Sequence, residues 1–223
     1  MSLINIVFDL DGTLIDSAPD IQSAASEVLR GCGEEGLSLE ETRSFIGEGA
    51  ALFVRRMMAA RDIPLTPQSL ETLNAEFLAQ YAVSVDKAVF YPGVQNTLAM
   101  LKSKGHRLGL CTNKPEQPAR AAIRYMGIDS VFDTFMAGGM GERSKPEPDM
   151  LLKAIEQLGD GPTLYVGDSE TDALTAKRAQ VPFALFSQGY RKGAVSEIHH
   201  DWVFEEFEAL PTIVEQATAQ QKR

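Results

Sequence analysis

The chain has 223 residues, of which 44% are hydrophobic and 23% are charged. These proportions are ordinary for a globular protein, so they exclude disordered and fibrous classes. With 21 Lys and Arg against 31 Asp and Glu, the formal net charge is -10 at pH 7. Nucleic acids and anionic membranes need a basic footprint, so neither is expected as a partner. A small anionic ligand would need a local positive site.

The length favours one large domain with a smaller insertion, because a typical domain takes roughly 150 residues. The two cysteines, Cys32 and Cys111, form neither a metal-binding spacing nor a disulfide framework, which is typical of a reducing compartment. No apolar run approaches the ~20 residues of a membrane span, and the N-terminal residues lack the pattern of a signal peptide. We therefore expect a cytoplasmic protein.

Short apolar runs typical of buried strands alternate with helical patterns along most of the chain. The expected strands are residues 4–8, 108–111, 135–137, 164–166 and 183–186, with 202–204 as a sixth candidate. The expected helices between them are residues 94–103, 119–126, 148–158 and 170–179. This alternation predicts a Rossmann-like α/β core of three layers, with a parallel sheet between helices. Such sheets bind ligands beyond the carboxyl ends of their strands.

One long segment interrupts the alternation after the first strand. Residues 17–83 contain no convincing strand, and helical patterns cover residues 21–30, 40–45, 50–60 and 67–81. We therefore expect an all-helical cap at residues 16–83, inserted into a core formed by residues 1–15 and 84–223. A helical bundle that enters and leaves at the strand ends would cover the ligand crevice as a lid.

Two aspartates follow the first expected strand. Asp9 and Asp11 alternate along an extended segment, so their side chains project to the same side. Paired carboxylates at a buried strand end need a cation or a shared proton. Gly12 then permits a tight turn and a close approach by a ligand. The alternative is that both acids are solvated loop residues.

A second acidic pair follows the strand at 164–166. Asp168 lies at its end, and Asp172 lies one helical turn further on, behind Ser169 as a plausible helix N-cap. Taken alone, this segment reads as an ordinary capped helix start. Together with Asp9 and Asp11 it brings three or four carboxylates to one crevice, for which Mg²⁺ is the natural partner.

Two further segments supply groups that bind anions. Thr112, Asn113 and Lys114 follow the second core strand and precede a helix, which is a suitable cradle for an anion. Lys145 lies in a loop shaped by neighbouring glycines and prolines. The alternatives are an ordinary polar loop and a solvated lysine.

In their order and on these elements, the four segments resemble the four motifs of the haloacid dehalogenase-like superfamily, and the helical insertion resembles its cap. The resemblance implies that Asp9 is the nucleophile and Asp11 the general acid and base. It assigns the phosphoryl group to Thr112 and Lys145. The implied Mg²⁺ ligands are Asp9, Asp11 through its carbonyl, Asp168 and, in support, Asp172. The further implied substrate contacts are Gly12, Thr13, Asn113 and Lys114.

Within that superfamily, residues 16–21, 45–50 and 112–115 resemble phosphoglycolate phosphatases, which implies 2-phosphoglycolate as the substrate. Gly47, Glu48 and Gly49 would then approach the substrate from the cap. Glu48 departs from the neutral Asn that is common at this position, and Arg55 or Arg56 would pair with it or bind the substrate carboxylate. The alternative for both arginines is a solvated helix face. Arg191 is another candidate.

Two alternatives stay open at this point. One is a phosphatase or mutase of the same superfamily that acts on a sugar phosphate, a nucleotide or pyrophosphate. The other is a non-catalytic, phospho-accepting regulatory domain. Asp11 argues against dehalogenation, since the dehalogenase branch lacks this second aspartate. The expected partner is a small phosphorylated molecule, and the chain would act as a monomer or a homodimer.

Overall fold

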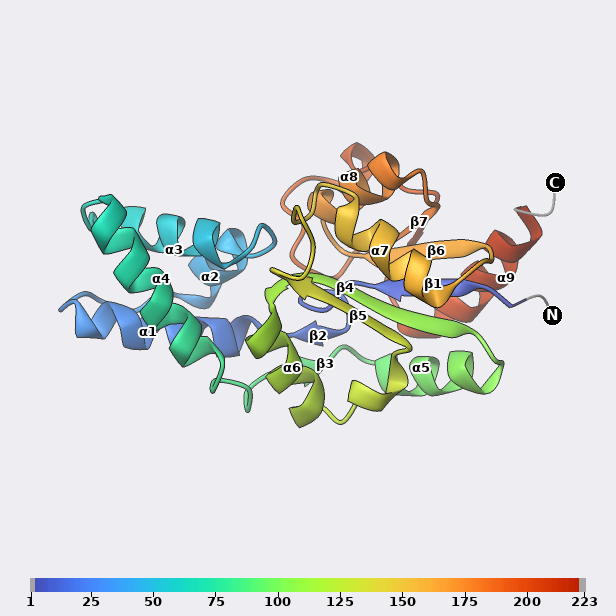
Figure 1. Cartoon of the computed structure of the whole chain (residues 1–223), viewed down its shortest axis with the longest axis horizontal. Coiled ribbons are helices and arrows are strands. Elements are labelled where there is room, and N and C mark those ends of the chain that lie inside the picture. The colour runs from blue at the N-terminus through green and yellow to red at the C-terminus, as the bar shows by residue number, and fades with distance from the viewer. Residues whose placement is uncertain (1–2, 221–223) are drawn as a thin grey trace.

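The computed structural model describes residues 3–220 (Figure 1). Residues 1–2 and 221–223, the outer ends of the predicted core, lie outside the described residues. A six-stranded sheet has the order β5-β4-β1-β6-β7-β8, and neighbouring strands pair in parallel. Its strands are β1 (Asn5–Phe8), β4 (Arg107–Pro115), β5 (Thr134–Gly138), β6 (Thr163–Gly167), β7 (Phe183–Phe186) and β8 (Trp202–Phe204). The predicted α/β class with a parallel, Rossmann-like sheet is confirmed.

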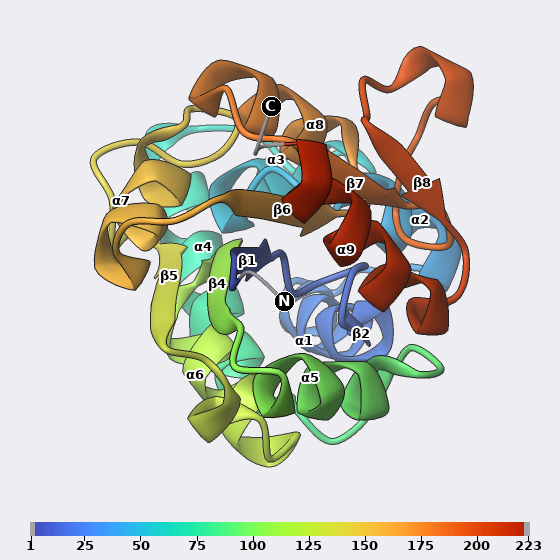
Figure 2. The same cartoon turned by 90° about the vertical axis from the view of Figure 1, so that its right-hand side faces the viewer.

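Helices cover both faces of this sheet (Figure 2). In β1, Ile6 and Phe8 belong to one apolar cluster and Val7 to another, as the period of two requires of a strand buried on both sides. The first cluster contains side chains of α5 (Val94–Ser103), α6 (Glu116–Tyr125) and α9 (Leu210–Gln220). The second contains side chains of α7 (Asp149–Leu158) and α8 (Glu170–Ala179). Strand β1, which Asp9 follows directly, is therefore held by side chains on both faces of the sheet.

The segment between β2 (Ile15–Asp16) and β3 (Val89–Phe90) forms a separate group of helices at one end of the molecule (Figure 1). The two short strands pair antiparallel, so the chain leaves and returns at one place. The helical insertion between them contains α1 (Ala18–Gly31), α2 (Leu39–Phe45), α3 (Ala50–Ala59) and α4 (Pro67–Tyr81). It has an apolar cluster of its own, in which Phe53 and Phe77 stack at 5.0 Å between ring centroids.

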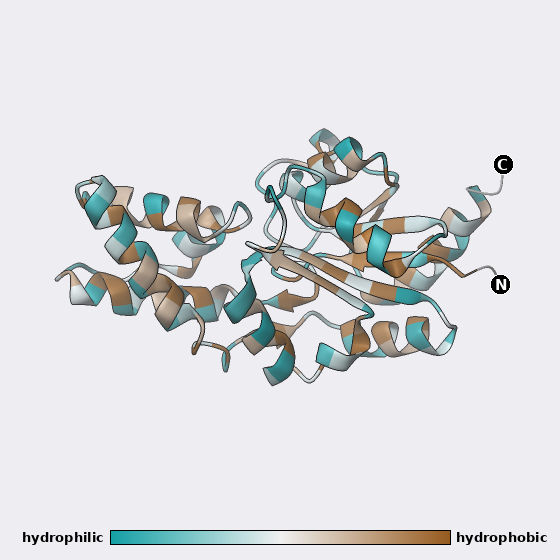
Figure 3. Ribbon diagram, viewed as in Figure 1, coloured by the Kyte–Doolittle hydropathy of each residue, from teal (hydrophilic) through white to brown (hydrophobic). Residues whose placement is uncertain are grey.

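Hydrophobic and hydrophilic residues are interleaved along the helices (Figure 3), as expected of helices with one buried face. Helices α4, α5 and α8 have the limits that the periodicity predicts. Three differences matter. Strand β4 continues to Pro115 and thereby includes Thr112 and Asn113. Strands β2 and β3 have only 2 residues each, so the alternation of buried and exposed residues that marks a strand cannot be seen in the sequence. The acidic stretch 205–208 overlaps a short 3₁₀ turn at Phe207–Ala209, and α9 begins only at Leu210.

Within residues 3–220, no helix has the length and apolar character needed to cross a membrane.

Candidate active site

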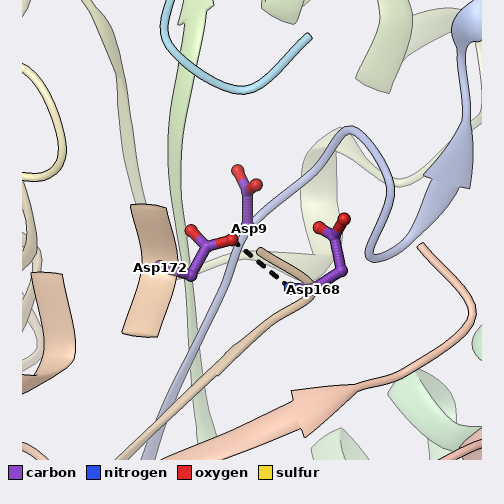
Figure 4. Close-up of side chains that lie close together, drawn as sticks. All are labelled: Asp9, Asp168 and Asp172. Atoms are coloured by element: carbon purple, nitrogen blue, oxygen red, sulfur yellow. Dashed lines mark hydrogen bonds between the residues drawn. The ribbon is translucent and has the colours of Figure 1, made fainter. Parts of the chain in front are cut away.

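Three aspartates meet at the carboxyl edge of the sheet (Figure 4). Asp9 follows β1, Asp168 follows the neighbouring β6, and Asp172 lies in the first turn of α8. Each contributes one carboxylate oxygen to a group whose members all lie within 4.8 Å of one another, and all three residues are buried. The parallel register of β1 and β6 therefore brings these side chains together as the sequence predicts. The side chain of Asp11 is not part of this cluster.

Hydrogen bonds fix the orientation of the two carboxylates of the second acidic pair, Asp168 and Asp172. Asp168 accepts from Thr13 Oγ1 at 2.7 Å and from the backbone N–H of Tyr190 at 2.6 Å. Asp172 Oδ2 accepts from Ser169 Oγ at 2.6 Å and from the backbone N–H groups of Ser169 and Asp168. The predicted N-cap Ser169 is thus reciprocally bonded with Asp172. Neither carboxylate can rotate freely.

Two glycines make room for Asp168. At Gly12, φ is +88°, and a Cβ there would lie 2.4 Å from Asp168 Oδ2. At Gly189, a Cβ would lie 2.2 Å from the Gly12 carbonyl oxygen and 2.4 Å from Asp168 Oδ2. The requirement at Gly12 was expected from its place in the turn. Nothing in the sequence pattern distinguishes Gly189. It lies 177 residues after Gly12 in the chain, and only the fold brings the two glycines together.

Lys145 is the cation of this cluster. Its Nζ lies 2.6 Å from Asp172 Oδ1, 2.9 Å from Asp9 Oδ1 and 3.0 Å from the hydroxyl of Tyr165. Burial lowers the pKa of the Lys145 ammonium, but the attraction of Asp172 and Asp9 outweighs burial and raises it. Lys145 is therefore charged at neutral pH and pairs directly with both Asp9 and Asp172.

The carboxylates carry more negative charge than Lys145 compensates. Burial raises the pKa of Asp9 to about 7, with Lys145 opposing the rise and Asp172 adding to it. Burial, followed by repulsion from Asp172 and Asp9, raises the pKa of Asp168 well above its usual value. Burial also acts on Asp172, but Lys145 outweighs it and lowers the pKa of that carboxyl. Asp9 Oδ1 accepts no hydrogen bond from residues 3–220, although it is ion-paired. An excess of buried carboxylate oxygen fits a divalent cation.

Asp11 lies in different surroundings. Its Oδ1 accepts from Ser17 Oγ at 2.6 Å and from Lys114 Nζ at 3.0 Å, and its Oδ2 lies 3.5 Å from the Tyr81 hydroxyl. Ser17 precedes α1 and Tyr81 ends α4, so both belong to the helical insertion. Asp11 is thereby held toward the insertion, apart from the cluster of three aspartates.

Two small cavities lie between the sheet edge and the insertion. The larger, of about 50 Å³, is bordered from the core by Asp9, Asp11 and residues 112–115. The smaller, of about 20 Å³, is bordered by Asp9, Asp11, Asp168 and Lys192. Gly47 borders both, and its carbonyl oxygen accepts from Asn113 Nδ2 at 3.1 Å. The insertion thus approaches the sheet edge, as predicted, and the group that makes this contact is the backbone carbonyl of Gly47.

Of the charged residues of the insertion, Glu48 and Arg56 form an ion pair, whereas Arg55 lies elsewhere. Glu48 lies 2.5 Å from Arg56 and 3.5 Å from Lys192 of the core, and Arg56 holds the pKa of Glu48 below its usual value. Arg55, expected to contact substrate, borders neither cavity; it lines a separate groove on the outer side of α3 with Leu65 and Leu70. Successive residues of an α-helix point in different directions, so Arg55 and Arg56 lie on different sides of α3, and only Arg56 reaches Glu48.

The structure also locates Arg191, a candidate for substrate binding, and three tyrosines that the sequence did not predict. Arg191 donates to the carbonyl oxygens of Ser187 and Gly193 and so holds its own loop. Three buried tyrosines contribute hydroxyls around the site: Tyr81, Tyr165 and Tyr190. Tyr81 and Tyr165 lie at buried positions of α4 and β6, where the apolar pattern does not distinguish Tyr from Phe, and Tyr190 lies in a loop without a pattern. Sequence reasoning therefore offered no signal for them.

Comparison with known proteins agrees with this architecture. The sequence model of haloacid dehalogenase-like hydrolases matches residues 5–180. A phosphoglycolate phosphatase of Rhodobacter capsulatus is 39% identical over 210 residues, covering 94% of this chain and 96% of the relative. One of Pseudomonas putida is 37% identical over 84% of this chain and 71% of the relative. The crystal structure of a predicted phosphoglycolate phosphatase from Haemophilus somnus superposes with a TM-score of 0.89 at 27% identity, covering 95% and 98% of the two chains.

The chain therefore belongs to the haloacid dehalogenase-like hydrolase family. The predicted enzyme class, a phosphatase, is confirmed. Membership in a hydrolase family also removes the alternative of a non-catalytic regulatory domain.

Proposed function

We propose that this protein is a Mg²⁺-dependent phosphatase that hydrolyses a small phosphomonoester, 2-phosphoglycolate, with Asp9 as the nucleophile. The observation that carries the proposal is the position of Asp9. It lies at the end of the central strand, 2.9 Å from Lys145 and within the cluster formed with Asp168 and Asp172. The names of the relatives support the substrate, since relatives that are 37% and 39% identical are phosphoglycolate phosphatases.

The residues that would hold Mg²⁺ are Asp9 and Asp168 through their carboxylates and Asp11 through its carbonyl, with Asp172 in support. The uncompensated charge of the cluster fits such an ion, as does Asp9 Oδ1, which accepts no hydrogen bond from residues 3–220. When bound, Mg²⁺ supplies positive charge that reduces the repulsion between an anionic phosphate and a carboxylate nucleophile.

The remaining chemistry is assigned to side chains of the chain. Asp9 attacks phosphorus, the bond from phosphorus to the alkoxide breaks, and an aspartyl-phosphate forms. Thr112 and Lys145 stabilise charge on the equatorial oxygens of the phosphoryl group. Asp11 gives its proton to the departing alkoxide. It then takes a proton from the water that releases phosphate, and such acid–base assistance is worth ~10²–10⁴-fold in rate.

The dimensions of the larger cavity favour a small leaving group. Its volume is about 50 Å³, and on the same measure a cavity needs about 10–15 Å³ to hold one water. On the insertion side its walls include Ile21, Phe53 and Phe77. A glycolate fits such a space better than a sugar or a nucleoside, which is larger and would place hydroxyls against the apolar walls on the insertion side.

A substrate panel tests this proposal. The purified enzyme is assayed with Mg²⁺ against 2-phosphoglycolate, glucose 6-phosphate, AMP and pyrophosphate. We expect the highest kcat/KM with 2-phosphoglycolate and no turnover by Asp9→Asn, with unchanged circular dichroism. A flat profile or a preference for a larger ester would contradict the substrate. Normal turnover by Asp9→Asn would contradict the nucleophile.

A further inference from the structure

The larger cavity contains one positively charged side chain among the residues that border it, Lys114. Lys145 does not border this cavity, and neither Arg55 nor Arg56 does. The side chain of Lys114 is only 2% exposed, so its charge acts on the cavity with little screening by solvent. A net charge of -10 for the whole chain makes such a local positive site necessary for an anionic ligand.

Two contacts hold the ammonium of Lys114 in place. It lies 3.0 Å from Asp11 Oδ1, and it donates to the hydroxyl of Tyr81. It also lies 4.2 Å from the centre of the Tyr81 ring, as a cation–π pair. An ammonium has three N–H donors, and no other acceptor for Lys114 is found among residues 3–220. The third donor therefore remains for a ligand in the cavity.

Tyr81 is itself held firmly. It is the last residue of α4, it is buried, and its ring packs on Phe77 at 5.3 Å between centroids. Burial, with the nearby Asp11 carboxylate next, raises the pKa of the phenol well above its usual value, so the hydroxyl keeps its proton. The helical insertion thus supplies a rigid support for a lysine that belongs to the core.

The other insertion residues around this lysine are mostly apolar. Ile21, Ile46, Phe53 and Phe77 border the same cavity, which Asp9 borders from the core. A ligand that fills this space has a phosphoryl group at Asp9, a short apolar connection, and an acceptor for the free N–H of Lys114. A second anionic group satisfies that donor better than a hydroxyl, because charge-assisted hydrogen bonds are the stronger ones.

We propose that Lys114 is a specificity-determining residue that binds a carboxylate on the leaving group of the substrate, and that Tyr81 positions it. The inference rests on the proposed function, since it assumes a phosphomonoester at Asp9. It places the recognition of the second anion in the core, on a strand end next to the general acid, rather than on the arginines of α3.

The test compares 2-phosphoglycolate with its amide, 2-phosphoglycolamide, which has nearly the same size but no carboxylate charge. For the wild type we expect kcat/KM to favour the acid by ~30-fold or more, the factor typical of a buried charged hydrogen bond. In Lys114→Met, which keeps the length of the side chain and removes its charge, we expect this ratio to fall to about 1.

The ratio separates binding of the carboxylate from an effect through Asp11. If Lys114 acts only by holding Asp11, Lys114→Met slows both substrates equally and keeps the wild-type ratio, and that result would overturn the proposal. A wild type that does not prefer the acid overturns the proposed substrate and this inference together, without any variant. The two failures are therefore distinguishable.

Tyr81→Phe keeps the test decisive if Lys114→Met folds poorly. It removes the hydroxyl and keeps the ring that packs on Phe77. We expect KM for the acid to rise by ~5–10-fold with kcat within ~2-fold, and KM for the amide to stay unchanged. Tyr125→Phe, at an exposed position on α6, is the matched control and should change neither substrate. An unchanged KM for the acid in Tyr81→Phe would overturn the positioning role.

Discussion

Lys145 Nζ lies 2.6 Å from Asp172 Oδ1, and both side chains are almost completely buried. Asp172 was expected mainly as a support for a metal. Asp172 also fixes Lys145, the lysine that reaches Asp9. The same oxygen, Asp172 Oδ1, accepts a hydrogen bond from the Tyr165 hydroxyl at 2.7 Å, which holds the carboxylate in place. One carboxylate thus connects Lys145, the cation proposed to bind the phosphoryl group, with the acidic cluster.

Asp172→Asn should therefore impair both catalysis and stability. The lysine would lose its main counter-charge, and removing one member of a buried ion pair costs ~3–5 kcal/mol. We expect a lower Tm and a kcat with 2-phosphoglycolate that falls by ~10²-fold or more, as for loss of a group that stabilises transition-state charge. Glu147→Gln, in the exposed pair with Arg178, is the control and should leave both quantities unchanged. A wild-type kcat in Asp172→Asn would contradict the role of this pair.

The stability of the metal-free protein should depend on pH through Asp9. Burial raises the pKa of Asp9 to about 7 in the folded state, whereas in the unfolded chain it lies near its ordinary value of 3.8. Between these values the folded state binds more protons than the unfolded state, so the free energy of unfolding decreases as pH rises from about 4 to 7. Asp168 shifts in the same direction.

Mg²⁺ competes with the proton for these carboxylates. The stabilisation by Mg²⁺ should therefore increase as pH rises, whereas the stability of the metal-free protein decreases. We expect the rise in Tm on addition of Mg²⁺ to be larger at about pH 8 than at about pH 5.5. Thermal unfolding with Mg²⁺ and with a chelator at both pH values measures this. An equal rise at both would show that these aspartates do not hold the ion.

The two arginines of α3 should respond differently to substitution. Arg55→Ala removes a side chain from the outer groove, so kcat/KM should stay within ~2-fold of the wild type. Arg56→Ala leaves Glu48 with only the longer contact to Lys192 beside the smaller cavity. We expect a rise in KM of up to ~5-fold, the size of a partly exposed ion pair, with kcat unchanged. A larger loss in Arg55→Ala than in Arg56→Ala would contradict this arrangement.

Gly189→Ala should disturb the proposed metal site around Asp168, from which Gly189 is distant in sequence. The added Cβ would collide with the Gly12 carbonyl and with Asp168, and overpacking of this kind costs ~1–3 kcal/mol. We expect a lower Tm and a higher Mg²⁺ concentration for half-maximal activity. Gly31→Ala, at the end of α1 with open space around it, is the control. Mg²⁺ dependence like that of the wild type would show that the loop can move away.

The sequence predicted the sheet and the convergence of Asp9 and Asp168, because parallel strands that end in polar residues must present them at one edge. It could not predict the hydroxyls of Tyr81, Tyr165 and Tyr190, since burial alone sets their pattern. It also could not decide between Arg55 and Arg56. Both flank the buried positions of α3, and the packing of α2 and α4 determines which one meets Glu48.

The pairing of β2 with β3 has a consequence for how such enzymes can diversify. Because the two crossings are hydrogen-bonded neighbours, the helical insertion begins and ends at one point of the core. Changing its length adds little closure entropy, since that cost grows only with the logarithm of loop length. Evolution, or an engineer, can therefore exchange this module for another and alter which leaving group is admitted, while the strand ends that transfer the phosphoryl group stay as they are.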